Sequence, residues 1–403
     1  MEQPNHKEIQ IQANGLKYMV TYGVCFFSLG LCMSQLGVLL PYMADNLGVS
    51  LAQISFLFTA NSLGYLLGSA GGGRLYDHYK SHHLMLIALV LMAMVGVLIP
   101  LIINIYILLV VIFIFGLGQG MLDIGGNVNI LWVFQSEASP YMNGLHFSFG
   151  FGAFVAPIII RLVMQFTNGS IVWPYWIISI LFLPSIIGLL LLRSPENPEK
   201  FDNTQQVKPA VNRKLITFMV ILFFLYVGVE VGFSGWIFTY VTQLNIVNET
   251  LGSYMTSVFW GALTMGRLLS IPLAKKIQPL NQLFGNFILA ILFVGVILLW
   301  PLNSTILWIS SAGLGLSLSS IFPTLMALAE TRMNMSGSIT GLFFFGTSLG
   351  SMVLPTLLGQ IFEFYGSYLV MVTLFMSIFL GLLLLIFVLY ASSRVEKETV
   401  SRN

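Results

Sequence analysis

Apolar stretches of about 20 residues, enough for a helix to cross the hydrocarbon core of a bilayer, follow one another along almost the whole chain of 403 residues. Only 8% of the residues are charged and 57% are hydrophobic, whereas a soluble domain has about 25% charged residues. So few charges cannot cover a surface that faces water. The sequence therefore predicts an integral membrane protein.

We expect twelve transmembrane helices, and the glycines and β-branched residues inside them suit close helix packing in lipid. The predicted spans are residues 17–41, 52–75, 83–103, 105–131, 141–165, 172–192, 215–241, 252–274, 281–300, 304–329, 337–361 and 367–391.

The polar segment 193–214 divides these spans into six and six. Lysine and arginine are concentrated in this linker, in the tails 1–16 and 392–403 and in the loops on the same side. By the positive-inside rule, these segments are predicted to be cytoplasmic. The two cysteines, Cys25 and Cys32, are too far apart along one helix for a disulfide.

The two halves of the chain repeat each other. GLG at 116–118 recurs as GLG at 313–315, and NGLHFSFGFGAFVAP (143–157) is similar to TGLFFFGTSLGSMVLP (340–355). Matching spans occur in the same order, which is typical of parallel repeats. The predicted fold class is an all-α membrane protein with two parallel-repeat six-helix bundles, residues 17–192 and 215–391.

The segment GGGRLYDHYK (71–80) resembles the signature of the loop between spans 2 and 3 in the major facilitator superfamily. The stretches MLDIGGNVNILW, NGLHFSFGFGAFVAP and FSGWIFTY resemble its sodium-dependent glucose transporter-like group and, more distantly, the fucose permease-like group. The first resemblance implies hexose transport, and the second implies proton-coupled sugar symport. The coupling ion is therefore expected to be H+ or Na+.

Asp123 stands in an apolar span, where a carboxylate at the helix centre costs about 2.5–3.5 kcal/mol on insertion scales. Asn127 is one turn later on the same face, and the two residues match an acid–asparagine pattern in span 4 of fucose permease-like proteins. We expect Asp123 to couple the ion to the substrate, with Asn127 near the substrate. The alternative is a structural hydrogen bond to a neighbouring helix.

Asn143 and His146 share one helix face with hydrogen-bonding groups suited to sugar hydroxyls. They stand where fucose permease-like proteins carry an asparagine and a glutamine. Those proteins also have an acid four residues before a proline in span 1, but here Gly37 precedes Pro41. The two-carboxylate pattern is therefore incomplete. A packing histidine is the alternative for His146.

Glu230 is a second acid within an apolar span, and its first-half equivalent is Cys32. It is expected to bind the coupling ion or sugar hydroxyls, or alternatively to form a charge pair with Arg267. Arg267 is matched in the repeat to Arg74, and a gating role is expected for both. Other candidate gating residues are Asp77 and Glu330, and other candidate substrate-binding residues are Gln35, Trp236, Tyr240 and Trp260.

No nucleophile–base pair, phosphate loop or metal-ligand pattern stands out, so the sequence favours a transporter over an enzyme and predicts no cofactor beyond the coupling ion. No basic block suggests nucleic acid. The predicted function is cation-coupled symport of a hexose-like sugar, a small-molecule substrate, by a monomer in the plasma membrane, and a bacterial inner membrane is favoured. The alternative function is proton-coupled export of amphiphilic or lipid-like molecules.

Overall fold

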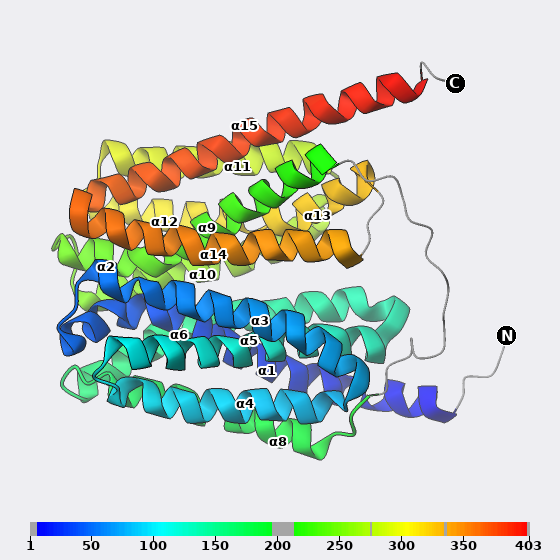
Figure 1. Cartoon of the computed structure of the whole chain (residues 1–403), viewed down its shortest axis with the longest axis horizontal. Coiled ribbons are helices and arrows are strands. Elements are labelled where there is room, and N and C mark those ends of the chain that lie inside the picture. The colour runs from blue at the N-terminus through cyan, green and yellow to red at the C-terminus, as the bar shows by residue number, and fades with distance from the viewer. Residues whose placement is uncertain (1–5, 196–212, 275, 334–336, 401–403) are drawn as a thin grey trace. The chain divides into compact units, whose positions relative to one another are not determined.

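The computed structural model describes residues 6–195, 213–274, 276–333 and 337–400, without the side chains of 6–14, 274, 337 and 389–400. Within these residues the regular secondary structure consists of helices (Figure 1). The chain forms two compact units: Met1–Leu47 with Ala60–Thr204, and Gly48–Thr59 with Gln205–Asn403. The predicted linker 193–214 lies largely outside the described residues.

The helices follow the predicted spans closely. In the first half they are α1 (His6–Leu47), α2 (Leu51–Ile54), α3 (Phe56–His78), α4 (Ser81–Leu98), α5 (Ile105–Phe134), α6 (Ala138–Phe166), α7 (Val172–Ile180) and α8 (Leu183–Leu191), with the short 3-10 helices η1 (Ile99–Leu101) and η2 (Gln135–Glu137). In the second half they are α9 (Arg213–Gln243), α10 (Glu249–Ala274), α11 (Pro279–Leu299), α12 (Ser304–Leu318), α13 (Ile321–Arg332), α14 (Gly337–Tyr365) and α15 (Ser367–Val400).

Three predicted spans are each divided between two helices: α2 and α3, α7 and α8, and α12 and α13. Pro323, near the start of α13, cannot donate a hydrogen bond to the residue four positions earlier, which favours the interruption before that helix. Among the described residues, nine helical segments are long and apolar enough to cross a membrane. The number of twelve spans therefore stays a prediction.

Glycines bring the backbones of the first unit together. A side chain at Gly30 on α1 would place its first carbon 1.9 Å from the carbonyl oxygen of Phe149 on α6. Between α3 and α5, a first side-chain carbon at Gly64 would lie 2.0 Å from the carbonyl oxygen of Phe113, and one at Gly120 would lie 2.1 Å from that of Tyr65. Only glycine fits such contacts, so these positions set how closely the helices approach.

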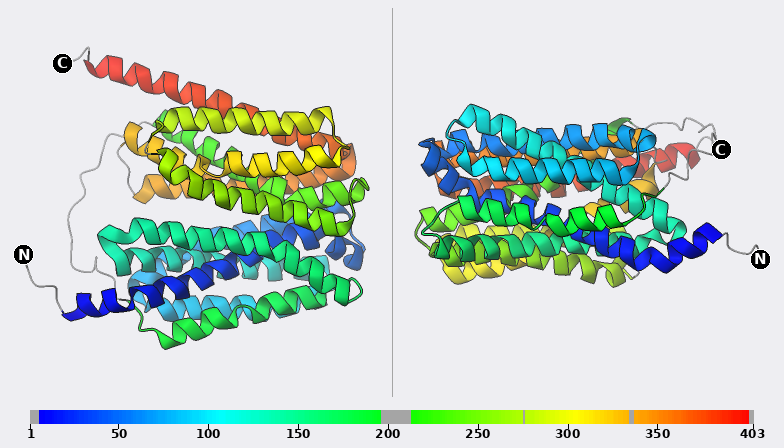
Figure 2. Two further views of the ribbon diagram at one scale, coloured as in Figure 1. Left: turned by 180° about the vertical axis from the view of Figure 1, so that it is seen from behind. Right: turned by 90° about the horizontal axis from the view of Figure 1, so that it is seen from below.

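The second unit repeats these contacts. On α14, a side chain at Gly350 would meet the carbonyl oxygen of Phe224 on α9 at 2.1 Å, and on α12 one at Gly315 would meet that of Phe259 on α10 at 2.4 Å. The pair α9 and α14 therefore corresponds to α1 and α6, and α10 and α12 correspond to α3 and α5. Both α1 with α6 and α9 with α14 run side by side (Figures 1 and 2).

One detail of the predicted repeat is wrong. Gly118 lies against Met92 on α4, whereas Gly315 lies against α10, so the two glycines are not equivalent. Gly116 is the position that meets α3, at the carbonyl of Asn61, and Gly315 follows it after 199 residues. Asn104 and Asn303, which cap the starts of α5 and α12, have the same separation.

This register changes two matches. The second-half counterpart of Asp123 is Phe322, so the repeat contains no second acid at that position. On α3 and α10 the separation is 198 residues, because Gly68 and Gly266 lie near the carbonyl oxygens of Leu117 and Leu316. Arg267, which directly follows Gly266, is therefore the counterpart of Ser69, and its predicted match to Arg74 is wrong.

The segment Gly48–Thr59 belongs to the second unit through its contacts with α14. The side-chain oxygens of Thr59 and Thr356 are 2.7 Å apart, and Gln360 donates a hydrogen bond of 2.7 Å to the carbonyl of Ala52. Helix α3 therefore begins in the second unit and continues in the first.

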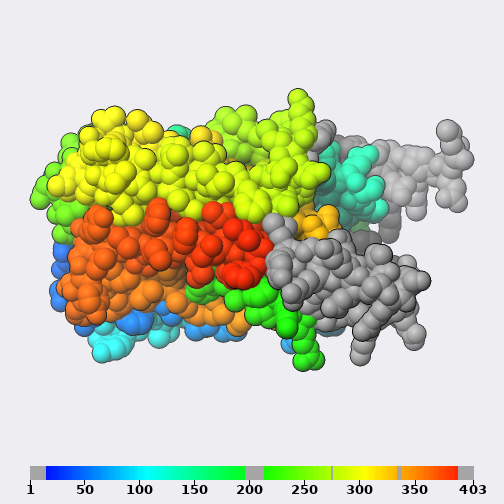
Figure 3. Space-filling view, turned by 90° about the horizontal axis from the view of Figure 1, so that it is seen from above, coloured from blue at the N-terminus to red at the C-terminus, as the bar shows by residue number. Residues whose placement is uncertain are grey.

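Large apolar side chains remain exposed along the outer helices of the second unit. Figure 3 shows α11 and α15 on one face of it, and their exposed side chains include Ile288, Leu289, Leu292, Met376, Phe379 and Leu380. A contiguous apolar surface of this kind indicates contact with a membrane or a partner. The length of the helices favours the membrane.

Candidate functional site

Two clusters of buried polar side chains each contain a carboxylate within an apolar span, one inside each unit. The aspartate cluster consists of Tyr65 on α3 with Asp123 and Asn127 on α5. The glutamate cluster consists of Tyr226 and Glu230 on α9 with Arg267 on α10.

In the aspartate cluster, both carboxylate oxygens of Asp123 accept a hydrogen bond. The Tyr65 hydroxyl donates to Oδ2 at 2.5 Å, and Nδ2 of Asn127 donates to Oδ1 at 3.2 Å. The Asn127 amide also donates to the backbone carbonyl of Asp123 at 2.9 Å. The predicted pairing of Asp123 with Asn127 on one helix face is confirmed.

The close approach of α3 and α5 places Tyr65 opposite Asp123. Gly120, three residues before Asp123, lies against the backbone of Tyr65 itself. One turn away, Nδ2 of Asn61 donates to Oε1 of Gln119 at 3.3 Å. The two helices therefore share a short row of polar pairs.

The donors to Asp123 are both neutral, and in the described part of the chain no basic side chain forms an ion pair with it. A carboxylate in such surroundings has its charge balanced only when it takes up a proton or holds a cation. The arrangement is therefore suited to an exchangeable positive ion.

The glutamate cluster differs because it contains its own cation. The Tyr226 hydroxyl donates a short hydrogen bond to Oε2 of Glu230, one turn later on α9. Nη2 of Arg267 lies 3.8 Å from Oε1 of Glu230. The charge pair between Glu230 and Arg267, one of the alternatives offered by the sequence, is thus present.

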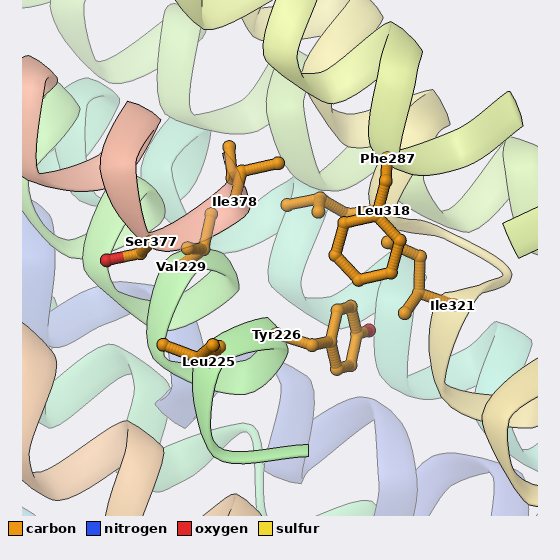
Figure 4. Close-up of a pocket in the computed structure, with 8 residues that line it drawn as sticks. All are labelled: Leu225, Tyr226, Val229, Phe287, Leu318, Ile321, Ser377 and Ile378. Carbon is orange, nitrogen blue, oxygen red and sulfur yellow. The ribbon is translucent and has the colours of Figure 1, made fainter. Parts of the chain in front are cut away.

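Figure 4 shows a narrow void beside Tyr226. It has no room for a water-sized sphere. Its walls come from α9, α11, α15 and the two ends of the interruption between α12 and α13, and the lining residues are Leu225, Tyr226, Val229, Phe287, Leu318, Ile321, Ser377 and Ile378. This void is a gap in apolar packing rather than a binding pocket.

Other predicted residues of the first unit lie on α1 and α6. Asn143 is exposed and His146 is half-buried, with the His146 ring edge-on to Phe26 at 5.8 Å between centroids. Gln35 is 3% exposed, and its Oε1 has no hydrogen-bond partner among the described residues. An unpaired buried acceptor is costly, so Gln35 is suited to receive a ligand hydroxyl.

A groove of about 360 Å³ lies between α1 and α6. Three phenylalanines dominate its walls, and the full lining is Met19, Val20, Gly23, Val24, Phe27, Phe147, Ser148 and Phe151. Phe147 directly follows His146, so the groove adjoins the predicted polar stripe of α6.

Three predicted aromatic residues of the second unit are fully buried. The Trp236 indole donates to the carbonyl of Pro355 at 2.8 Å, and the Tyr240 hydroxyl donates to that of Pro301 at 3.3 Å. Because the protein already uses their donors, this placement favours packing over substrate binding for both residues. Trp260 lies edge-on to Phe259.

The candidate gating residues lie apart from the two clusters, except Arg267. Arg74 and Asp77 are exposed near the end of α3, and Glu330 is exposed near the end of α13. Their gating roles stay predictions. The partner found for Arg267 is Glu230 inside the unit.

Sequence reasoning missed the two tyrosines that hold the acids. Tyr226 was detectable, since it stands one turn before Glu230. Tyr65 is on another helix than Asp123, and the available signal was the pairing of the glycine motifs GYLLG and GLGQG, which permit two helices to approach closely.

A family model described as Major Facilitator Superfamily matches residues 22–355. Sodium-dependent glucose transporter 1 of Xenopus laevis is 29% identical over 358 residues, covering 82% of this chain and 73% of that protein. Major facilitator superfamily domain-containing protein 4A of Homo sapiens is 25% identical, covering 88% of each chain.

Among solved structures, that of the nucleoside transporter NupG superposes with a TM-score of 0.77 at 14% identity, covering 92% of this chain and 99% of that one. At this identity the similarity concerns the fold alone. Together with the family match, it confirms the predicted fold class. The chain is therefore a multi-pass membrane transporter rather than an enzyme, and it belongs to the Major Facilitator Superfamily.

Proposed function

We propose that this protein is a secondary active transporter that couples uptake of a hexose-like sugar to the inward movement of H+ or Na+ by alternating access. The relatives named as sodium-dependent glucose transporters support the sugar and the cation. We place it as a monomer in the plasma membrane, of bacterial inner-membrane type, with both termini in the cytoplasm.

The observation that carries the proposal is the aspartate cluster. Asp123 is held by two neutral donors with no cationic partner among the described residues. A carboxylate kept this way in an apolar helix bundle would be of little use for stability, because burying an unpaired charge is unfavourable. Reversible binding of a proton or cation would neutralise the Asp123 carboxylate and give this residue a function.

For the sugar, the groups available in the first unit are Asn127, Asn143, His146 and Gln35. Gln35 is the best supported, because its buried acceptor is unused within the described chain. In the second unit, Trp260 is the remaining aromatic candidate.

Uptake by proteoliposomes tests this function. Purified protein is reconstituted, and accumulation of radiolabelled D-glucose, D-galactose and D-mannose is measured under an inward proton gradient, an inward sodium gradient or neither. We expect one gradient to drive accumulation above the external concentration. If the hexoses equilibrate without accumulating under either gradient, the proposed ion coupling is wrong. If no hexose is taken up, the proposed sugar substrate is wrong.

The groove between α1 and α6 favours a second candidate, the proton-coupled export of amphiphilic molecules, because its walls are aromatic and aliphatic with few hydroxyl partners. Substrate-dependent proton movement that accompanies extrusion of a lipophilic cation from the vesicles, with no response to hexoses, would support it over sugar uptake.

A further inference from the structure

We propose that Glu230 and Arg267 together bind two neighbouring hydroxyl groups of the sugar, so that the glutamate cluster recognises the substrate while the aspartate cluster couples the ion. This inference rests on the proposed function, since it names the place where the second unit holds the sugar.

The pair has the open geometry that a hydroxyl requires. Nη2 of Arg267 and Oε1 of Glu230 are 3.8 Å apart, whereas a closed charge-assisted hydrogen bond measures about 2.7–2.9 Å. Tyr226 occupies only the other carboxylate oxygen, Oε2. A ligand hydroxyl can therefore donate to Oε1 and accept from the guanidinium.

Arg267 has donors to spare. A guanidinium carries five N–H groups in a planar fork, and the described contacts of Arg267 are those with Glu230 and the Tyr226 hydroxyl. A second N–H of the same fork can meet the adjacent hydroxyl of a sugar ring. Two neighbouring hydroxyls match this fork better than a single one does.

The guanidinium is only partly enclosed by the protein. The Arg267 side chain is 26% exposed and that of Glu230 is 10% exposed. On α10, Arg267 shares a face with the fully buried Trp260 and Leu263, seven and four residues earlier, and with the exposed Ile271, four residues later.

The charges of the two clusters explain the division of tasks. Glu230 with Arg267 is neutral overall, so the pair can bind an uncharged polyol without taking up an ion. Asp123 has no such partner among the described residues, so its charge remains available for a cation. A ligand with a net charge would upset the balance of the glutamate cluster, which favours neutral sugars.

The first experiment compares Glu230→Gln and Arg267→Lys with the wild type in the full-length protein in detergent. Dissociation constants are measured calorimetrically for D-glucose and its 2-, 3-, 4- and 6-deoxy analogues, or for the corresponding series of D-galactose or D-mannose if that hexose binds more tightly. Lysine keeps the charge but loses the planar fork. Arg213→Lys, an exposed position at the start of α9, is the matched control.

For the wild type, we expect removal of either of two adjacent hydroxyls to weaken binding at least tenfold. Glu230→Gln and Arg267→Lys should each bind the parent hexose at least tenfold more weakly than the wild type. In these variants, removal of either of the two hydroxyls should weaken binding less than threefold further. Arg213→Lys should behave like the wild type in both respects. Unchanged affinities, or deoxy penalties that persist in full in the variants, would overturn the proposal.

The charge exchange E230R/R267E separates recognition from folding, because it keeps the ion pair but reverses the donor and acceptor. We expect it to melt close to the wild-type temperature while its hexose affinity stays at least tenfold weaker. Recovery of both stability and affinity would mean that the pair is only structural. If the wild type binds none of the three hexoses, the proposed sugar function itself fails and this inference fails with it.

Discussion

The hydroxyl of Tyr65 is the most informative single group in the first unit, because it donates to the acid on which ion coupling is proposed to depend. Tyr65→Phe removes this donor and leaves the ring. Losing a hydrogen bond to a charged group costs about 1.5–3 kcal/mol. We expect the variant to melt at a lower temperature than the wild type. In vesicles, it should accumulate less hexose while its counterflow is less affected. Equal losses in accumulation and counterflow would argue against a role of Tyr65 in coupling.

Trp236 is expected to behave as a packing residue. In Trp236→Phe, the carbonyl of Pro355 loses its indole donor and part of a fully buried ring is removed. Core truncations and lost buried hydrogen bonds each cost about 1–3 kcal/mol. Thermal unfolding should shift downward while the KM for hexose uptake stays within twofold, and a large rise in KM at unchanged stability would instead place Trp236 at the substrate.

At the scale of elements, glycine contacts determine which helices meet and at what register. Gly64→Ala would put a carbon 2.0 Å from the carbonyl oxygen of Phe113, whereas nothing lies within 4 Å of the corresponding position at Gly71 on the same helix. Alanine gains about 1 kcal/mol over glycine in helix propensity. We expect Gly71→Ala to be neutral or stabilising and Gly64→Ala to lower the melting temperature and the yield of folded protein.

If both alanine variants melt alike, the close approach of α3 and α5 does not stabilise the unit as described. The comparison is internally controlled, since the two glycines are on one helix and the substitution is the same.

The helices and the repeat could be predicted from the sequence, because hydropathy and span length are local properties. It was insufficient for the register between halves: the GLG motif matches two glycines at a separation of 197 residues, whereas at the observed separation of 199 only Gly116 and Gly315 match. The partner of Asp123 on α3 depends on that register and on the backbone contact at Gly120. A helical pattern alone does not contain this information.

At the scale of the whole molecule, the segment 48–59 belongs to the second unit, although α3 continues into residues of the first. We expect its contact with α14 to open during alternating access. In the double variant Thr59→Cys/Thr356→Cys, an oxidant should form a disulfide, because the native side-chain oxygens are 2.7 Å apart. Cys25 and Cys32 are buried and should not compete.

We expect the cross-linked protein to lose at least nine-tenths of its hexose uptake and to recover it after reduction, with each single-cysteine variant insensitive to the oxidant. Full uptake by protein shown to be cross-linked would mean that this contact persists throughout transport.

The most direct test of ion coupling is Asp123→Asn in proteoliposomes, assayed for accumulation under an ion gradient and for counterflow without one. The amide keeps the size of the carboxyl but has no charge to balance. We expect accumulation to be abolished while counterflow remains within threefold of the wild type. Accumulation at the wild-type level would contradict the assignment of Asp123 as the coupling acid.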